Sequence, residues 1–241
     1  MNDLILGDCL TELRSMGDDC VDLTITSPPY NMNLRIRNGE YTSRQIVKEL
    51  STKYEGFPDN LPMEKYYEFN RDVITELLRV SPLVFYNVQF LTGNKVALFD
   101  LIGHFSKQLK EVIIWDKMNA QPAIGKGVMN SRYEVILVFD RKNAISRYFS
   151  QAKFKRGTLE NLWQIKRGKK IDASHGAVFP EELVTKIIKN FSSKGDIVLD
   201  PFLGTGTTAL VAKKLGRKYI GIEIGQPYME IAKRRLEDHK N

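Results

Sequence analysis

The stretch that decides the fold is DIVLDPFLGTGTTALVAKKLGRKYIGIEI, residues 196–224. Its apolar start predicts a buried strand that ends at the carboxylate of Asp200. Gly204 and Gly206 follow, and they predict a turn in which the backbone can approach a ligand closely. A helical pattern and a second apolar run come next. The stretch therefore predicts one strand–turn–helix–strand unit.

The second half of this unit points to a bound nucleoside. The helix opens at Thr207, where the free amides of its first turn favour a negatively charged group. The second strand carries Glu223 near its end, where an acid holds the ribose hydroxyls in nucleoside-binding α/β folds. The third glycine of the dinucleotide fingerprint is absent, and the missing Gly-Lys-Ser/Thr excludes a Walker phosphate loop. The two acids around the turn therefore carry the prediction of a nucleoside cofactor.

Outside this unit, apolar runs rich in β-branched residues alternate with helical patterns. The alternation predicts an α/β protein with a doubly wound, mostly parallel sheet. The expected strands are a short one in LILGD (4–8), then 21–26, 83–88, 111–115, 133–139, 196–199 and 218–224; the expected helices are 63–80, 94–108, 179–191, 206–215 and 226–237. We expect one domain over residues 1–241, with a loop at about 31–60 that is long enough to be functional or mobile.

A second informative stretch is VDLTITSPPYNMN, residues 21–33. Here a predicted strand runs directly into Ser27, Pro28, Pro29 and Tyr30. Proline fixes its own φ angle and pushes the preceding residue toward an extended conformation. The sequence therefore predicts that a hydroxyl, several carbonyls and an aromatic ring are held stiffly at the end of a strand.

The charge of the chain suggests a polyanionic partner. The net charge is +7 and the sequence pI is about 9.2. Residues 141–170 hold ten basic side chains and one acid, Glu160, with aromatic residues between them. Such a segment suits phosphate contacts and base stacking, although a solvated basic surface is an equal alternative.

The sequence also bears on the location of the protein. Cys9 and Cys20 are the only cysteines, no apolar run is long enough to span a membrane, and no secretory signal is visible. An intracellular, cytoplasmic protein is therefore expected.

Taken together, TSPPYN and the later DPFLGTGTT resemble the amino-methylating DNA methyltransferases, which use S-adenosylmethionine. The catalytic motif of that family is (D/N/S)-P-P-(Y/F/W), and its cofactor motif is D-P-F-x-G-(T/S)-G-T. GDCLTEL at 7–13 and HGAVFPEELV at 175–184 resemble two further family blocks, with His175-Gly176 where His-Pro is common. The catalytic motif precedes the cofactor motif, as in the circularly permuted beta class.

The resemblance implies a Rossmann-like methyltransferase fold and assigns roles to individual residues. The Ser27 oxygen and the Pro28 carbonyl would accept hydrogen bonds from the amino group of a flipped base, and Tyr30 would stack on that base. Pro29 belongs to the same motif. The implied cofactor-binding residues are Asp8, Cys9, His175, Phe179, Asp200, Pro201, Phe202, Gly204, Gly206, Thr207 and Glu223. Some of these residues have an alternative role. Asp8 could be a turn carboxylate and His175 a structural hydrogen-bonding group, and Pro201 and Phe202 could pack in the core. Neither a metal ion nor a covalent cysteine is needed.

The same resemblance implies double-stranded DNA as the partner, and a homodimer is expected because relatives are often dimers. A target-recognition region is expected at about 117–172, with DNA contacts from Lys153, Lys155, Arg156, Lys166 and Arg167.

The reaction itself is open in three respects. Serine before Pro-Pro favours cytosine N4 as the methylated atom, with adenine N6 as the alternative. Methylation of RNA or of a protein amide would use the same chemistry. A DNA-binding module without catalysis is the third alternative, and the intact Ser27, Tyr30, Asp200 and Glu223 speak against it.

Overall fold

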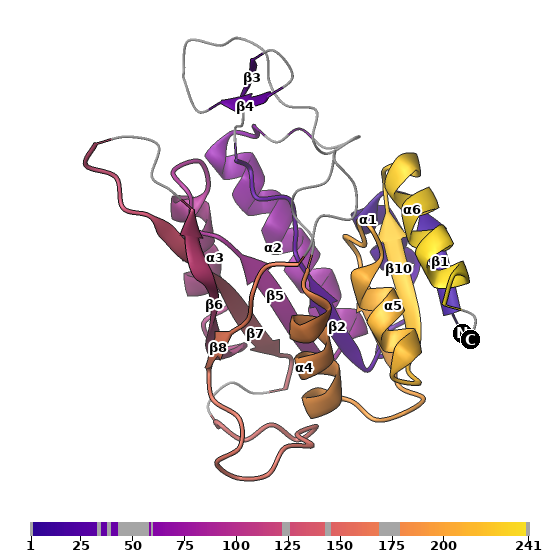
Figure 1. Cartoon of the computed structure of the whole chain (residues 1–241). Helices are drawn as coiled ribbons and strands as arrows, with labels where there is room; N and C mark the ends of the chain where they lie inside the picture. The colour runs from indigo at the N-terminus through magenta and orange to yellow at the C-terminus, as the bar shows by residue number, and fades with distance from the viewer. Residues whose placement is uncertain are drawn as a thin grey trace.

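The computed structural model describes residues 2–32, 35–37, 40–42, 58, 60–121, 126–142, 146–168 and 179–239. In these residues one eight-stranded sheet crosses the molecule, with β1 at one edge and β8 at the other (Figure 1). Its strands, in spatial order, are β1 (Asn2–Leu6), β10 (Lys218–Glu223), β9 (Ile197–Asp200), β2 (Leu23–Thr26), β5 (Leu83–Val88), β7 (Ser131–Asp140), β6 (Leu109–Gln121) and β8 (Leu162–Gln164).

The sheet is mostly parallel, as the sequence predicts. Only β7 runs against its neighbours, β5 and β6. The other adjacent pairs, including β2 with β9 and β8 with β6, are parallel. The strand ends therefore form two further margins of the sheet, distinct from the sides formed by β1 and β8. One margin, which we call the carboxyl edge, holds the carboxyl ends of β2, β5, β6, β8, β9 and β10. The opposite edge is called the amino edge.

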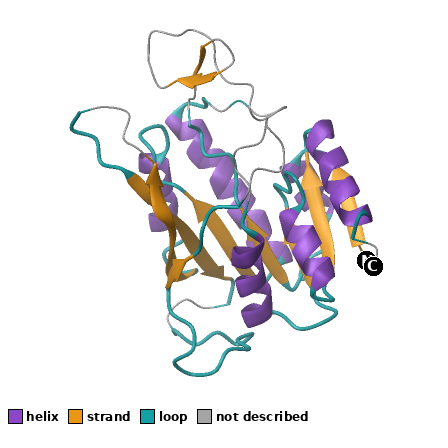
Figure 2. Cartoon of the chain, in the orientation of Figure 1, coloured by secondary structure: helices purple, strands orange, loops and turns teal. Residues whose placement is uncertain are grey.

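Helices cover both faces of the sheet (Figure 2). On one face lie α1 (Cys9–Ser15), α2 (Met63–Val80) and α3 (Lys95–His104), and on the other lie α4 (Glu181–Phe191), α5 (Thr207–Lys214) and α6 (Gln226–Glu237). The period-two alternation of a strand explains this double cover. In β5, Val84 and Tyr86 pack with the first group of helices, whereas Leu83 and Phe85 pack with the second. Both faces of the sheet are thus buried, as in doubly wound folds.

The structure differs from the sequence predictions mainly at short elements. The helix predicted at 94–108 ends at His104, and turns at 105–108 lead into a strand that is longer than predicted. Helix α1 and strand β8 are not in the prediction; β8 holds only three residues, among them the fully buried Trp163. Within 31–60, β3 (Arg35–Arg37) and β4 (Glu40–Thr42) form a hairpin. The mobility expected for this loop falls largely outside the described residues. None of the described helices has the length and hydropathy that a bilayer-spanning segment requires.

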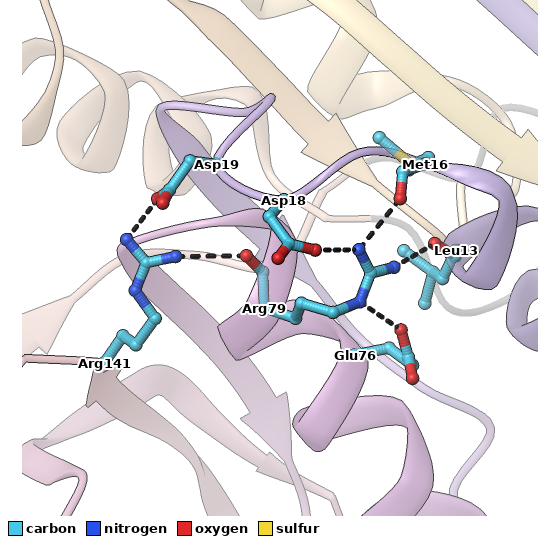
Figure 3. A network of polar contacts seen from close by, with 7 residues as sticks. All are labelled: Leu13, Met16, Asp18, Asp19, Glu76, Arg79 and Arg141. Atoms are coloured by element: carbon cyan, nitrogen blue, oxygen red, sulfur yellow. Dashed lines mark hydrogen bonds and ion pairs between the residues drawn. The ribbon is translucent and has the colours of Figure 1, made fainter.

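Arginine side chains hold the amino edge together (Figure 3). Arg79, at the end of α2, donates to the carbonyls of Leu13 (2.7 Å) and Met16 (2.8 Å) and also binds Asp18 and Glu76. Arg141, after β7, donates to the Arg79 carbonyl at 3.0 Å and pairs with Asp19. This arginine clamp, Arg79 with Arg141, fixes the chain between α1 and β2, and so determines where β2 enters the sheet.

Candidate active site

Asp200 joins the two motifs that the sequence singled out. Its Oδ1 accepts from the Thr26 hydroxyl at 2.8 Å and from the Phe202 amide at 3.1 Å, and its Oδ2 accepts from the Thr208 hydroxyl at 2.7 Å. Only 3% of Asp200 is exposed, and burial raises its pKa to about 6. The carboxylate therefore ties the end of β2, one residue before Ser27, to the glycine turn and to α5. A direct contact with the cofactor stays a prediction.

Glu223 has acceptor capacity left for a ligand. Its Oε2 accepts from the Gly204 amide at 2.7 Å and its Oε1 accepts from the Gly225 amide at 2.8 Å. Each carboxylate oxygen can accept a second hydrogen bond. Burial raises the pKa of Glu223, and the backbone amides oppose that shift. The residue thus has the chemistry to hold the ribose hydroxyl pair of a nucleoside at the end of β10.

Gly206 is required by the turn and by a close neighbour. Its φ is 82°, a left-handed conformation that favours glycine, and an added Cβ would lie 2.7 Å from the Cβ of Ala232 in α6. The same helix supports the turn through Arg235, which donates to the Thr205 carbonyl at 2.6 Å and to the Thr207 hydroxyl at 3.2 Å. Helix α6 thus contributes buried apolar residues, Ala232 and Leu236, and also a cation that holds the turn.

Asp8 and Cys9 stand at the start of α1. Asp8 is exposed and caps the helix, since its Oδ1 accepts from the amide and the hydroxyl of Thr11, each at 2.9 Å. Cys9 is 7% exposed and packs in the core. Burial raises the pKa of the Cys9 thiol to about 12, so this thiol is not a nucleophile at neutral pH. The structure places both residues beside β10, because Gly7 donates to the Glu223 carbonyl at 3.0 Å.

The remaining predicted cofactor residues are buried or partly buried, except His175, which lies outside the described residues. Pro201 is buried, and Phe202 is partly buried with its ring 6.0 Å from that of Phe69. Phe179, which is also partly buried, packs against the core just before α4. His175 lies outside the described residues, as does most of HGAVFP.

The catalytic motif follows β2 at the carboxyl edge, and its backbone carbonyls are held from several directions. The Tyr66 hydroxyl donates to the Pro29 carbonyl at 2.8 Å, and the Asn94 amide donates to the Tyr30 carbonyl at 2.6 Å. None of the hydrogen bonds among the described residues uses the Pro28 carbonyl. The structure thus fixes the motif rigidly and leaves the carbonyl that the sequence assigned to the substrate available as an acceptor.

Asn31 closes the motif on its far side. Its side-chain amide donates to the carbonyls of Leu61 (2.9 Å) and Gly93 (3.1 Å), and its Oδ1 accepts from the Leu61 amide at 2.7 Å. The residue adopts a φ of 52°, which asparagine tolerates better than most residues. This clasp, Asn31 with Leu61, brings together the two ends of the segment between them.

Three further residues, which surround the Tyr30 hydroxyl, were also not foreseen from the sequence. The Tyr30 hydroxyl donates to Glu134 Oε2 at 2.8 Å; Asn87 donates to both, and Lys117 lies 3.0 Å from Glu134 Oε1. Asn87, Glu134 and Lys117 come from β5, β7 and β6. The available signal was a polar side chain inside otherwise apolar strands, LVFYNV and YEVILVF, where burial demands a partner.

The predicted DNA contacts divide between the two edges of the sheet. Lys166 and Arg167 are exposed and follow β8, so they lie at the carboxyl edge with Ser27. Lys153, Lys155 and Arg156 are exposed in the segment before β8, which hangs from the lower end of the sheet in Figure 1. The Lys153 amide donates to the Asn190 carbonyl at the end of α4, 2.8 Å away. The structure therefore does not bring these three residues together with the catalytic motif.

The arrangement suits transfer of a group to an amine that is held by fixed acceptors next to a nucleoside site. Within the described part of the chain, no group of three or more His, Cys, Asp or Glu side chains could hold a metal ion.

The comparisons with known proteins agree with this arrangement. The family model N6_N4_Mtase, described as "DNA methylase", matches residues 21–234. The orphan methyltransferase M.BamHII of Bacillus amyloliquefaciens is 32% identical over 251 residues, covering 94% of this chain and 92% of that protein. The type II methyltransferase M.HpaI of Haemophilus parainfluenzae is 30% identical over 260 residues, covering 99% and 75%.

Among solved structures, the PvuII DNA methyltransferase (cytosine-N4-specific) matches with a TM-score of 0.73 at 19% identity, covering 100% of this chain and 88% of that one. At this identity the likeness shows the fold alone, which is the predicted Rossmann-like methyltransferase fold. The chain belongs to the N6/N4 DNA methylase family, and it is an S-adenosylmethionine-dependent DNA amino-methyltransferase.

Proposed function

We propose that this enzyme methylates the exocyclic amino group of a base flipped out of double-stranded DNA. We further propose that the methylated nitrogen is N4 of cytosine rather than N6 of adenine. The hydrogen bond of 2.8 Å between Thr26 and Asp200 carries the proposal. It joins two motifs that lie 174 residues apart in the chain, so that the acceptors at Ser27 and Pro28 adjoin the turn that suits the cofactor.

In this proposal the residues of the chain act by orientation. S-adenosylmethionine supplies an activated methyl group, whose carbon–sulfur bond breaks as the amine lone pair forms the new carbon–nitrogen bond. The Ser27 oxygen and the Pro28 carbonyl accept the two amine hydrogens, which aims the lone pair at the methyl carbon; one of these protons then leaves to solvent. Correct orientation of this kind supplies much of the rate enhancement in such reactions. Glu223 holds the cofactor's ribose, and Tyr30 stacks on the base.

The choice between cytosine N4 and adenine N6 rests on the serine of the motif. A hydroxyl could in principle also donate to N3 of cytosine. In the structure, however, Ser27 donates its one hydrogen to Tyr30 at 2.8 Å. The preference for cytosine is therefore supported by the family resemblance alone. Mass spectrometry of nucleosides from DNA methylated in vitro tests it: N4-methylcytosine is expected, and N6-methyladenine alone would reverse the choice.

Incubation with tritiated S-adenosylmethionine and separate DNA, RNA and protein acceptors tests the substrate class. Label is expected in double-stranded DNA and absent from RNA and protein. We also propose a cytoplasmic location for the enzyme, as expected from the sequence.

For the assembly we propose a homodimer. Support comes from an apolar groove of about 430 Å³ beside α3, lined among others by Phe90, Phe99 and Tyr133. Phe99 and Tyr133 line the same groove and are 59% and 50% exposed, and contiguous exposed apolar surface is typical of interaction sites. Light scattering should give twice the chain mass, and Phe99→Asp should return it to the monomer value.

A further inference from the structure

The Ser27 hydroxyl is the first member of a hydrogen-bonded chain that ends at a carboxylate. Ser27 Oγ donates to the Tyr30 hydroxyl at 2.8 Å, and Tyr30 donates to Glu134 Oε2 at 2.8 Å. Asn87 Nδ2 donates to the Tyr30 oxygen at 2.5 Å and to Glu134 Oε2 at 2.7 Å. The members come from the end of β2, from β5 and from β7, so three neighbouring strands bring them together.

Glu134 forms an ion pair with a buried lysine. Its other oxygen, Oε1, lies 3.0 Å from the ammonium of Lys117, and the two side chains are 13% and 2% exposed. A charged carboxylate has no hydrogen to donate, so it can only accept. The single hydrogen of the Tyr30 hydroxyl is therefore committed to Glu134.

The Tyr30–Glu134 hydrogen bond sets which group donates and which accepts in the rest of this hydrogen-bond network. Because Tyr30 has no second hydrogen, its oxygen can only accept from Ser27, and the Ser27 hydrogen must point toward the protein. The alternative acceptor for that hydrogen, the Asn87 carbonyl at 3.4 Å, also belongs to the protein. In either case the lone pairs of Ser27 are turned away from the network. A serine held in this way can accept from an amino group but cannot donate to one.

We infer that Glu134 is a positioning residue for the methyl transfer: acting through Tyr30, it fixes the Ser27 hydroxyl as a hydrogen-bond acceptor for the amino group of the target base. The inference rests on the proposed role of Ser27. It also gives a reason for the buried Lys117–Glu134 pair, since two buried charges contribute little net stability by themselves. Asn87, which is 2% exposed, keeps Oδ1 without a partner among the described residues, a cost that is more common at functional sites than elsewhere.

The same two strands supply a matched control. At their other end, Lys110 and Asp140 form a pair of 3.2 Å with side-chain exposures of 4% and 14%. Asp140 has no hydrogen bond to Tyr30 or Ser27; its Oδ1 accepts from the Lys142 amide. Substitutions at the two pairs therefore disturb equally buried charges in the same ladder, and only one pair leads to the catalytic motif.

The test compares Glu134→Gln and the charge-neutral Glu134→Gln/Lys117→Met with Asp140→Asn and Asp140→Asn/Lys110→Met. The charge-neutral variants leave no unpaired buried lysine, so they report on the reaction even where a single variant folds poorly. The rate of methyl transfer is measured in a single turnover with saturating S-adenosylmethionine and duplex DNA, and cofactor affinity by calorimetry. Both Glu134 variants should transfer the methyl group at least tenfold more slowly with cofactor affinity within twofold, whereas both Asp140 variants should stay within twofold of wild type in rate.

A double-mutant cycle separates positioning from a merely structural role. In a Tyr30→Phe background the link to Ser27 is already broken, so Glu134→Gln should change the rate less than twofold. The inference is overturned if Glu134→Gln/Lys117→Met transfers at the wild-type rate, or if Glu134→Gln slows Tyr30→Phe as much as it slows wild type. A Ser27→Ala enzyme with wild-type rate would instead remove the proposed function on which the inference rests.

Discussion

Strands β6 and β7 are joined at each end by a buried ion pair between a lysine and a carboxylate, and the two pairs have different hydrogen-bond partners. Lys110–Asp140 at the amino edge and Lys117–Glu134 at the carboxyl edge have nearly the same length, 3.2 and 3.0 Å, and the same degree of burial. The first pair is completed by a backbone amide, whereas the second is completed by Tyr30. An ion pair by itself therefore does not identify a functional residue; its remaining hydrogen-bond partners do.

The contrast extends along both edges of the sheet. At the amino edge the arginine clamp donates charged hydrogen bonds to backbone carbonyls and acids, which fixes the chain there. At the carboxyl edge neutral amides and hydroxyls hold the motif from behind, at Pro29, Tyr30 and Asn31. Changes at the amino edge should therefore alter stability, and changes at the carboxyl edge should alter the rate.

The largest effect is expected from Ser27→Ala. Loss of one preorganised polar group that contacts the reacting atoms commonly costs about 100-fold or more in kcat. The matched change is Ser81→Ala, because Ser81 is buried just before β5 at the amino edge and donates to the Leu83 carbonyl at 3.0 Å. It should lower the free energy of unfolding by about 1 kcal/mol and leave kcat unchanged. Equal kcat values for the two variants would break the comparison.

Asp200→Asn should change how stability depends on pH. Burial raises the pKa of Asp200 from 3.8 to about 6 in the folded state. The folded protein then binds the proton more tightly than the unfolded chain, so this stabilising contribution is complete below pH 4 and is lost as the pH rises through 6. The stability of the wild type relative to Asp200→Asn should therefore fall by about 3 kcal/mol between pH 3 and pH 8. Urea unfolding across this range measures it, and parallel curves for the two proteins would contradict the assignment.

Arg79→Met should destabilise the fold without slowing the reaction. The variant loses the hydrogen bonds to the Leu13 and Met16 carbonyls, which should lower the free energy of unfolding by about 2 kcal/mol. The control is Arg14→Met, since Arg14 is 59% exposed and lies 4.0 Å from Asp72, too loose a pair to contribute much. A reduced kcat in folded Arg79→Met would mean that the amino edge also controls the rate.

The smallest effects concern DNA and distinguish the two sets of basic residues. Lys166→Ala/Arg167→Ala at the carboxyl edge should flatten the dependence of log K on log salt by about 0.9 for each lost phosphate contact. Replacing Lys153, Lys155 and Arg156 together should leave that slope unchanged. Fluorescence anisotropy with a labelled duplex over a range of salt concentrations measures both. If only the triple variant flattens the slope, the DNA contacts the amino edge instead.

Much of the fold could be predicted because each local pattern agreed with the final structure. Apolar runs such as LVFYNV became buried strands, and DPFLGTGTT became a turn before a helix. The misses were short elements: α1 is capped by Asp8, for which the sequence suggested a cofactor contact or a turn carboxylate, and β8 has too few residues for a visible period.

The catalytic motif could be read from the sequence, but its support could not. Tyr30 and Glu134 lie 104 residues apart, and they meet only because β7 inserts next to β5, an order that the chain does not reveal. The internal hydrogen bonds of Asp200 to Thr26 and Thr208 were not foreseen either, and its contact with the cofactor stays a prediction. Local propensity does not distinguish a carboxylate that binds a ligand from one that binds its own neighbours.

The clasp between Asn31 and Leu61 has a consequence for how specificity can diverge among such enzymes. One asparagine side chain joins both ends of the intervening segment, and Gly93 packs so tightly below it that an added Cβ would lie 2.6 Å from the Asn31 carbonyl. The entropic cost of closing a loop between two joined ends rises slowly with its length. Each doubling adds about 0.6 kcal/mol to the free energy. Changes in the length of the segment between Met32 and Asn60 should therefore cost little free energy of folding. The segment is thus a place where the sequence can be lengthened or replaced at little cost in stability.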